Sequence, residues 1–138
     1  MNHIFIDTGP FQALNNEEDQ YFSQTEQRMR SIEGKGMVLI TSDYVIDEVY
    51  TALLIRAGYK NAMHFDQYLR RGGWEIIFIS QHYFSLAQSI FRRYNKDKRW
   101  SFTDCTRRHC ATTTICTRDS ASSTTRNGRR AWIPKKSP

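Results

Sequence analysis

The sequence lacks the features of membrane and secreted proteins. No apolar run approaches the roughly 18 residues that a membrane-spanning helix needs. Residues 1–7 carry neither the basic start nor the long apolar stretch of a secretory signal. No internal repeat is present, and 138 residues are enough for one domain but not for two. These absences predict a single-domain protein of the cytoplasm, with no membrane partner.

Cysteine is absent from the first 104 residues. The three cysteines, an odd number, all lie in the last quarter of the chain, which argues against a disulfide framework. Together with His109 they also lack the paired C-x₂-C spacing of structural zinc sites, so we do not expect zinc. The residues in question are Cys105, Cys110 and Cys116.

The body of the chain is not basic, although the net charge is +6. Residues 1–104 carry 12 Lys and Arg against 13 Asp and Glu, whereas residues 105–138 carry 8 against 1. This last quarter also has 11 Ser and Thr among its 34 residues and no sustained helical or strand period. We therefore predict a domain over 1–106 and an irregular, basic, Ser/Thr/Arg-rich tail over 107–138. A solvated appendage is a simpler interpretation of the tail than a nonspecific nucleic-acid contact.

Short apolar runs alternate with helical patterns through the first 104 residues. Strands that alternate with helices pair in parallel through crossovers, so the sequence predicts an α/β fold with helices on both faces of a parallel sheet. Ligands of such folds gather at the carboxyl ends of the strands, where Asp7 stands. The expected strands cover 3–6, 37–40 and 75–79, and the expected helices 17–33, 43–57, 60–71 and 81–97, besides one that follows Thr8-Gly9-Pro10.

Three acidic residues stand where an α/β protein can use them in chemistry. Asp7 ends the first strand, Glu48 falls at the edge of the buried arc of helix 43–57, and Asp104 marks the entry to a further helix. A carboxylate at a buried edge is costly unless it is paired or bound to a cation. Clustered carboxylates bind Mg²⁺ or Mn²⁺, which position water and neutralise phosphate in phosphodiester hydrolysis.

Each of these acids also has a purely structural interpretation. Asp7 can cap the helix that follows it, and Glu48 can pair with a buried arginine. Asp104 or Thr103 can be the cap of the helix that they begin. Spacing alone leaves both interpretations open.

The two other acids of helix 43–57 have an ordinary explanation. Ser42 is expected as the N-cap, and Asp43 in the first turn complements the helix dipole. Asp43 and Asp47 both fall opposite the buried arc. We expect both to be solvated and outside any site.

Three motifs contain the candidate acids, in order along residues 3 to about 106. They read Ile4-Phe5-Ile6-Asp7-Thr8-Gly9-Pro10-Phe11, then Thr41-Ser42-Asp43-Tyr44-Val45-Ile46-Asp47-Glu48, then Ser101-Phe102-Thr103-Asp104-Cys105. This series resembles the leading motifs of the PIN-domain nucleases, particularly the VapC-like toxins. The haloacid-dehalogenase phosphatases fit less well, because they place a second Asp where this chain has Gly9.

The resemblance implies a fold, a function and a site. The fold is a PIN-like α/β/α sandwich with a central parallel sheet. The function is that of an endoribonuclease that depends on Mg²⁺ or Mn²⁺, with Asp7, Glu48 and Asp104 as metal-binding and catalytic acids and Thr8 and Thr103 as supporting hydroxyls. The expected partners are RNA, an antitoxin protein and a second copy of the chain. The alternative is a catalytically impaired PIN-like protein that acts only by binding an antitoxin or RNA.

The last quarter of the chain departs from the family pattern. The family follows its third acid with an apolar helix, a strand and a fourth acid about twenty residues on, but positions 122–125 here read Ser-Ser-Thr-Thr. Asp119 is the only acid of the tail, and a solvated loop residue explains it better than a fourth ligand. One explanation is a change of reading frame near residue 106, which would leave the C-terminal strands missing or disrupted and the activity impaired.

Cations and aromatic residues are interleaved just before the third acid. Such a pattern can guide RNA phosphates and stack a base. A solvated helix face with two core aromatic residues is the commoner structure. The residues concerned are Arg92, Arg93, Tyr94, Lys96, Lys98, Arg99 and Trp100.

Overall fold

The protein is represented by a computed structural model that describes residues 2–108. Along the chain it has β1 (His3–Phe5), α1 (Thr8–Leu14), α2 (Phe22–Ile32), β2 (Val38–Ser42), α3 (Asp43–Arg56), α4 (Tyr59–Arg70), β3 (Trp74–Ile77) and α5 (Gln81–Tyr94). A further helical segment covers 102–108. The alternation of strands and helices expected from the sequence is confirmed. Residues 107 and 108 continue the last helical segment, and the rest of the tail, including Asp119, lies outside the described residues.

One helix begins later than its pattern predicted. Helix α2 starts at Phe22 rather than near residue 17. In the preceding loop, Asn16 and Asp19 accept hydrogen bonds from the backbone N–H groups two residues ahead, those of Glu18 and Tyr21. Such local side-chain turns compete with helical hydrogen bonds, so this stretch forms a loop.

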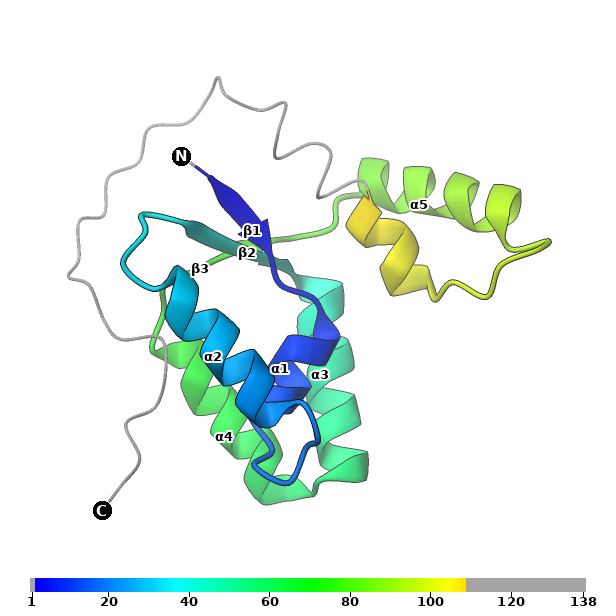
Figure 1. The fold of residues 1–138 in the computed structure, drawn as a ribbon. Helices are drawn as coiled ribbons and strands as arrows, with labels where there is room; N and C mark the ends of the chain where they lie inside the picture. The colour runs from blue at the N-terminus through cyan, green and yellow to red at the C-terminus, as the bar shows by residue number, and fades with distance from the viewer. Residues whose placement is uncertain (1, 109–138) are drawn as a thin grey trace, which may run out of the picture.

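The sheet has three parallel strands in the order β1-β2-β3. The register places Phe5 opposite Ile40 and Ile40 opposite Glu75. Strand β1 leads into α1 and β2 leads into α3, so both helices begin at the same edge of the sheet (Figure 1). This α/β architecture with a parallel sheet agrees with the predicted fold class.

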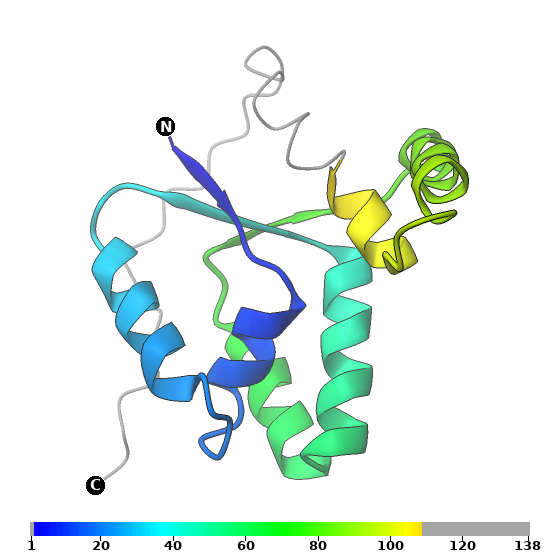
Figure 2. The same ribbon diagram turned by 45° about the vertical axis from the view of Figure 1, so that its right-hand side comes forward.

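Helices α1 to α4 lie together on one side of the sheet, whereas α5 and segment 102–108 lie past the edge at which β2 meets α3 (Figures 1 and 2). Within residues 2–108 the helices therefore cover one face of the sheet, not both faces as the sequence predicted. Segment 102–108 joins α5 through one aromatic side chain. The ring of Phe102 lies 5.1 Å from that of Phe84 and 6.1 Å from that of Phe91, both on α5, and 6.2 Å from that of Tyr44 on α3. Phe102 therefore connects both pieces to the start of α3.

An aromatic cluster forms the core between the sheet and the four helices. Phe11 and Phe65 are completely buried, and their rings meet edge to face with centroids 5.4 Å apart. Trp74 of β3 lies 5.0 Å from Phe11, and Tyr50 of α3 lies 5.0 Å from Phe65. Because Phe11 is buried in the first turns of α1, the cluster fixes the position at which β1 passes into α1.

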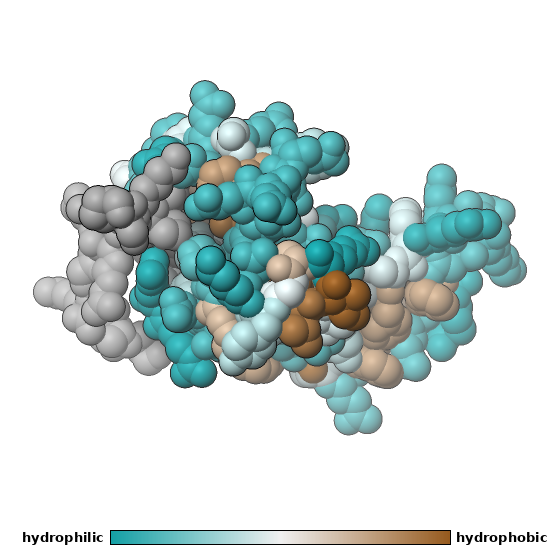
Figure 3. Space-filling model, turned by 90° about the horizontal axis from the view of Figure 1, so that it is seen from below, coloured by the Kyte–Doolittle hydropathy of each residue, from teal (hydrophilic) through white to brown (hydrophobic). Residues whose placement is uncertain are grey.

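The surface is mainly hydrophilic in the view from below, with apolar patches (Figure 3). Around the turn from α3 to α4, three large apolar side chains are exposed: Leu54 at 53%, Ile55 at 77% and Tyr59 at 69%.

No helix within residues 2–108 is long and apolar enough to cross a membrane.

Candidate metal and nuclease site

Asp7 lies between the end of β1 and the start of α1. Its Oδ1 accepts a hydrogen bond from the backbone N–H of Thr8 at 2.9 Å, which makes Asp7 the N-cap of α1. Its Oδ2 forms an ion pair with Nη1 of Arg107 at 2.5 Å. One carboxylate oxygen of Asp7 thus caps the helix, and the other pairs with the guanidinium of Arg107.

Glu48 is partly buried on α3, as the helical wheel predicted. Its Oε2 accepts a hydrogen bond from the Thr8 hydroxyl at 3.0 Å, across 40 positions of the chain. A buried arginine, the structural partner considered from the sequence, is therefore not what holds this oxygen. Because Thr8 follows Asp7 directly, its hydroxyl connects the second acid to the first.

Asp104 belongs to a capping box at the start of segment 102–108. Its Oδ2 accepts hydrogen bonds from the backbone N–H and the hydroxyl of Ser101, at 3.1 and 3.0 Å, while its own N–H donates to the Ser101 hydroxyl at 3.1 Å. The expectation that Thr103 or Asp104 would be the cap is wrong, because the Ser-x-x-Asp spacing gives that place to Ser101. Oδ1 of Asp104 lies 4.0 Å from Nη2 of Arg107.

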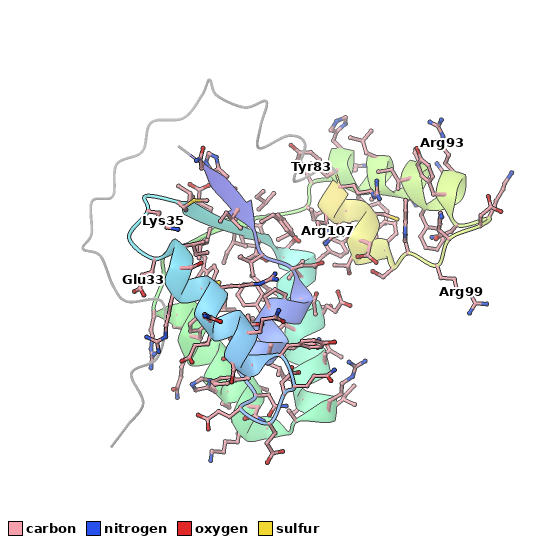
Figure 4. The ribbon with its side chains drawn as sticks, in the orientation of Figure 1. Glu33, Lys35, Tyr83, Arg93, Arg99 and Arg107 are labelled. Carbon is pink, nitrogen blue, oxygen red and sulfur yellow. The ribbon has the colours of Figure 1, made fainter. Side chains whose placement is uncertain are left out.

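Arg107 is the site residue that sequence analysis missed. It lies three residues after Asp104 on the same helical segment, and its side chain extends toward the junction of β1 and α1 (Figure 4). The two ends of its guanidinium face Asp7 and Asp104. The signal was its spacing from Asp104, since residues three apart share a helix face, but position 107 was assigned to the irregular tail.

The structure connects the three predicted acids without making them a metal-binding cluster in this conformation. Asp7 and Asp104 face one cation, that of Arg107, and Glu48 reaches them through Thr8. Within residues 2–108, no group of three acids, histidines or cysteines is close enough to hold a metal ion. The donor set consists of carboxylate and hydroxyl oxygens, the ligands that Mg²⁺ and Mn²⁺ prefer.

A groove of about 520 Å³ runs beside Glu48, between α1, α3 and segment 102–108. Thr103, predicted as a supporting hydroxyl, lies on its wall with Glu48, and Asp47 lies on the same wall and is exposed as expected. The full lining is Gln12, Asp47, Glu48, Thr51, Ala52, Ile55, Arg56 and Thr103. The groove therefore presents polar and apolar surface in about equal parts and adjoins the second acid.

The start of α3 is held more firmly than the sequence suggested. Ser42 is its N-cap, as expected, with Oγ accepting from the N–H of Val45 at 3.3 Å. Asp43, however, is not simply solvated. Its Oδ1 accepts from the N–H of Tyr44 at 3.0 Å and from that of Ile79 at 3.1 Å, so it binds the segment that follows β3. This contact spans 36 positions and has no local sequence signal.

Cys105, directly after the third acid, is fully buried. Burial, followed by the negative charge of Asp104, raises the pKa of the Cys105 thiol. A thiol with a raised pKa stays protonated at neutral pH and is a poor ligand and nucleophile. His109, Cys110 and Cys116 lie outside the described residues.

The aromatic residues before Asp104 stack with each other and with arginines. Trp100 lies 5.3 Å from Tyr94, and the guanidinium of Arg108 lies 4.1 Å from its ring centre. The guanidinium of Arg93 lies 5.4 Å from the ring centre of Tyr94. Arg93 and Arg99 extend outward from the far end of α5 and from the loop after it, away from Arg107 (Figure 4). Contact of these cations with RNA stays a prediction.

Comparison with solved structures identifies a clear relative in fold. The VapC20 toxin of Mycobacterium tuberculosis, which cleaves the sarcin–ricin loop, superposes with a TM-score of 0.72 at 21% sequence identity, over 80% of this chain and 82% of the toxin. The PIN-like α/β fold and the resemblance to VapC-like toxins are thereby confirmed at the level of the fold. No protein-family model and no curated protein sequence matches the chain.

Proposed function

We propose that this chain is a metal-dependent endoribonuclease of the VapC-like kind, which hydrolyses RNA phosphodiester bonds. The observation that carries the proposal is the convergence of Asp7 and Asp104 on one cation at the end of β1, with Glu48 joined to them through Thr8. Support comes from the fold, which is shared with a toxin that cleaves the sarcin–ricin loop.

The acids fit a hard divalent cation by their chemistry. A positive group already lies between Asp7 and Asp104, so the two carboxylates are arranged around one cationic position. Asp7 and Asp104 would hold Mg²⁺ or Mn²⁺, and Glu48 would hold it or orient water. When bound, the metal supplies charge neutralisation at the phosphate and a more acidic water.

Each acid has one oxygen fixed by a neighbouring donor. The N–H of Thr8 holds Oδ1 of Asp7, the Thr8 hydroxyl holds Oε2 of Glu48, and Ser101 holds Oδ2 of Asp104. Such supporting hydrogen bonds orient a ligand before its cation arrives and reduce the cost of ordering it. Thr8 and Ser101 are thus positioning residues rather than catalytic ones.

The resemblance to VapC-like nucleases also implies partners. RNA is the proposed substrate, and an antitoxin protein and a homodimer remain predictions drawn from the resemblance. The location in the cytoplasm stays a prediction as well.

The proposal is tested by RNA cleavage. Purified protein should cleave single-stranded RNA or a sarcin–ricin stem-loop with Mg²⁺ or Mn²⁺ and stop when EDTA is added. Asp7→Asn, Glu48→Gln and Asp104→Asn should each lower the cleavage rate at least ~10²-fold. Each removes a carboxylate that would hold the metal, and the metal stabilises the charge of the transition state. Glu18→Gln is the matched control, since Glu18 is an exposed acid in the loop beyond the other end of α1.

The outcomes separate the two functions considered. Loss of cleavage in the three site variants but not in Glu18→Gln supports the nuclease. Tight RNA binding without cleavage by the wild-type chain would favour the binding-only alternative. Cleavage that persists in EDTA would exclude the metal.

Thr8 provides a finer test of positioning. Thr8→Val removes the hydrogen bond to Glu48 and should lower the maximal cleavage rate about tenfold with little change in KM, because the acid loses its orientation rather than its charge. Thr8→Ser keeps a hydroxyl and should restore most of the rate. Equal rates for Thr8→Val and Thr8→Ser would show that the hydrogen bond does not position Glu48.

A further inference from the structure

We propose that Arg107 is an internal competitor for the divalent cation, a residue that holds the acidic site closed until metal displaces it. This inference rests on the metal site of the proposed function. It adds a property of this chain, namely that metal binding requires Arg107 to leave two of the ligands.

The geometry places one guanidinium against two of the proposed ligands. Nη1 of Arg107 contacts Oδ2 of Asp7, the oxygen that does not accept the capping hydrogen bond of α1. Nη2 faces Oδ1 of Asp104, the oxygen that does not accept from Ser101. Arg107 therefore lies against the oxygens that remain for a cation. A planar, forked, permanently charged group suits such a pair of carboxylates.

The same carboxylate oxygens cannot serve both cations at once. A guanidinium and a divalent ion at this position would repel each other at short range, so binding of one lowers the affinity for the other. The exposed fractions of the side chains allow the exchange: 39% for Arg107, 31% for Asp7 and 39% for Asp104. The arginine can thus move to solvent without unfolding the core.

A purely structural role for Arg107 makes the opposite prediction. If the Asp7–Arg107 pair acts mainly as a clamp that keeps segment 102–108 against α1, its removal would displace Asp104 and weaken metal binding. If Arg107 competes with metal, its removal would tighten metal binding. The sign of the change in metal affinity therefore distinguishes the two.

The experiment measures Mn²⁺ binding to the full chain by the loss of the free-Mn²⁺ EPR signal. Arg107→Gln should bind Mn²⁺ at least about tenfold more tightly than wild type. The matched control is Arg70→Gln, which loses the same charge and breaks a different Arg–Asp pair, with Asp66 on the surface of α4. Circular dichroism melting checks that each variant is folded.

A second measurement keeps the test valid if Arg107→Gln does not fold. The side-chain NMR resonances of Arg107 in the wild-type chain, identified by their loss in Arg107→Lys, should shift as Mg²⁺ saturates the site. Resonances that stay unchanged while Mg²⁺ binds would overturn the competition.

The two proposals fail in different ways. If wild type and Arg107→Gln both fail to bind Mn²⁺, the metal part of the proposed function falls, and this inference with it. If both bind and Arg107→Gln does not bind more tightly than wild type, only the inference is overturned. Tighter binding by Arg107→Gln together with unchanged binding by Arg70→Gln is the expected result.

Discussion

Replacing Tyr68 with phenylalanine should stabilise the protein. The Tyr68 side chain lies in the core at 5% exposure, with its ring 5.4 Å from that of Trp74. Its hydroxyl is buried and has no hydrogen-bond partner among the residues that the structure describes. An unpaired buried hydroxyl costs roughly 1–3 kcal/mol of desolvation. Tyr68→Phe removes that cost and keeps the ring contact.

The expected gain is about 1 kcal/mol in the free energy of unfolding, the lower end of the range, because a small void replaces the oxygen. For a domain of this size, such a gain corresponds to a rise of about 4 °C in Tm. Urea unfolding should give a higher midpoint with an unchanged slope. A loss of stability in Tyr68→Phe would refute the reasoning and show that the hydroxyl has a partner.

The pH dependence of the same variant provides an independent check. Burial raises the pKa of Tyr68 above its ordinary value of 10.0, so the folded state favours the neutral phenol. A raised pKa contributes stability that is complete below the pKa of the unfolded chain and declines as the pH rises above it. The advantage of Tyr68→Phe should therefore grow above pH 10. Tyr50→Phe is the contrasting control, since Tyr50 donates a hydrogen bond to Asp66 at 2.6 Å and its removal should destabilise the protein.

Two further predictions concern local hydrogen bonds. Ser42→Ala removes the side-chain cap of α3 and should lower the free energy of unfolding by about 1 kcal/mol in urea titrations, with Ser85→Ala on the exposed face of α5 as a control that changes little. Hydrogen bonds from Arg70 and then from Tyr50 lower the pKa of Asp66 below 3.8, so their contribution to stability is present above that pH and is lost as the pH falls below it. The stability difference between wild type and Arg70→Gln should accordingly shrink in acid, and a difference that is constant from pH 6 to pH 2 would contradict the assignment.

The sequence predicted those parts of the fold that local patterns determine. Apolar runs located all three strands, and helical spacing located α3, α4 and α5 to within a few residues. The start of α2 was wrong because two side-chain turns precede it. The role of Asp43 was also wrong, because its hydrogen bond to the N–H of Ile79 joins elements that are distant in the chain.

The sequence predicted the three acids of the candidate site but not Arg107, the arginine that pairs with two of them. The positions of Asp7 and Glu48 follow from a strand end and from a helical wheel. The capping interpretation of Asp7 is confirmed, and its role in a metal site stays a prediction, for which its second oxygen, paired with Arg107, is available. Arg107 was missed because its relation to Asp104 becomes visible only once the segment is known to be helical. Its approach to Asp7, 100 positions away, depends on how that segment packs.

The contacts made by Phe102 couple the proposed site to the packing of segment 102–108. Asp7 and Glu48 belong to the main body, whereas Asp104 lies on a segment that Phe102 connects to Tyr44 of α3 and to α5, a helix in which only Ala87 is fully buried. A site divided in this way is complete only in the fraction of molecules in which the segment is docked. The apparent dissociation constant of any shared ligand is then the intrinsic constant divided by that fraction. If the three acids bind one ligand as proposed, Phe102, which is neither an acid nor a cation, would thereby affect the ligand concentration at which the site fills.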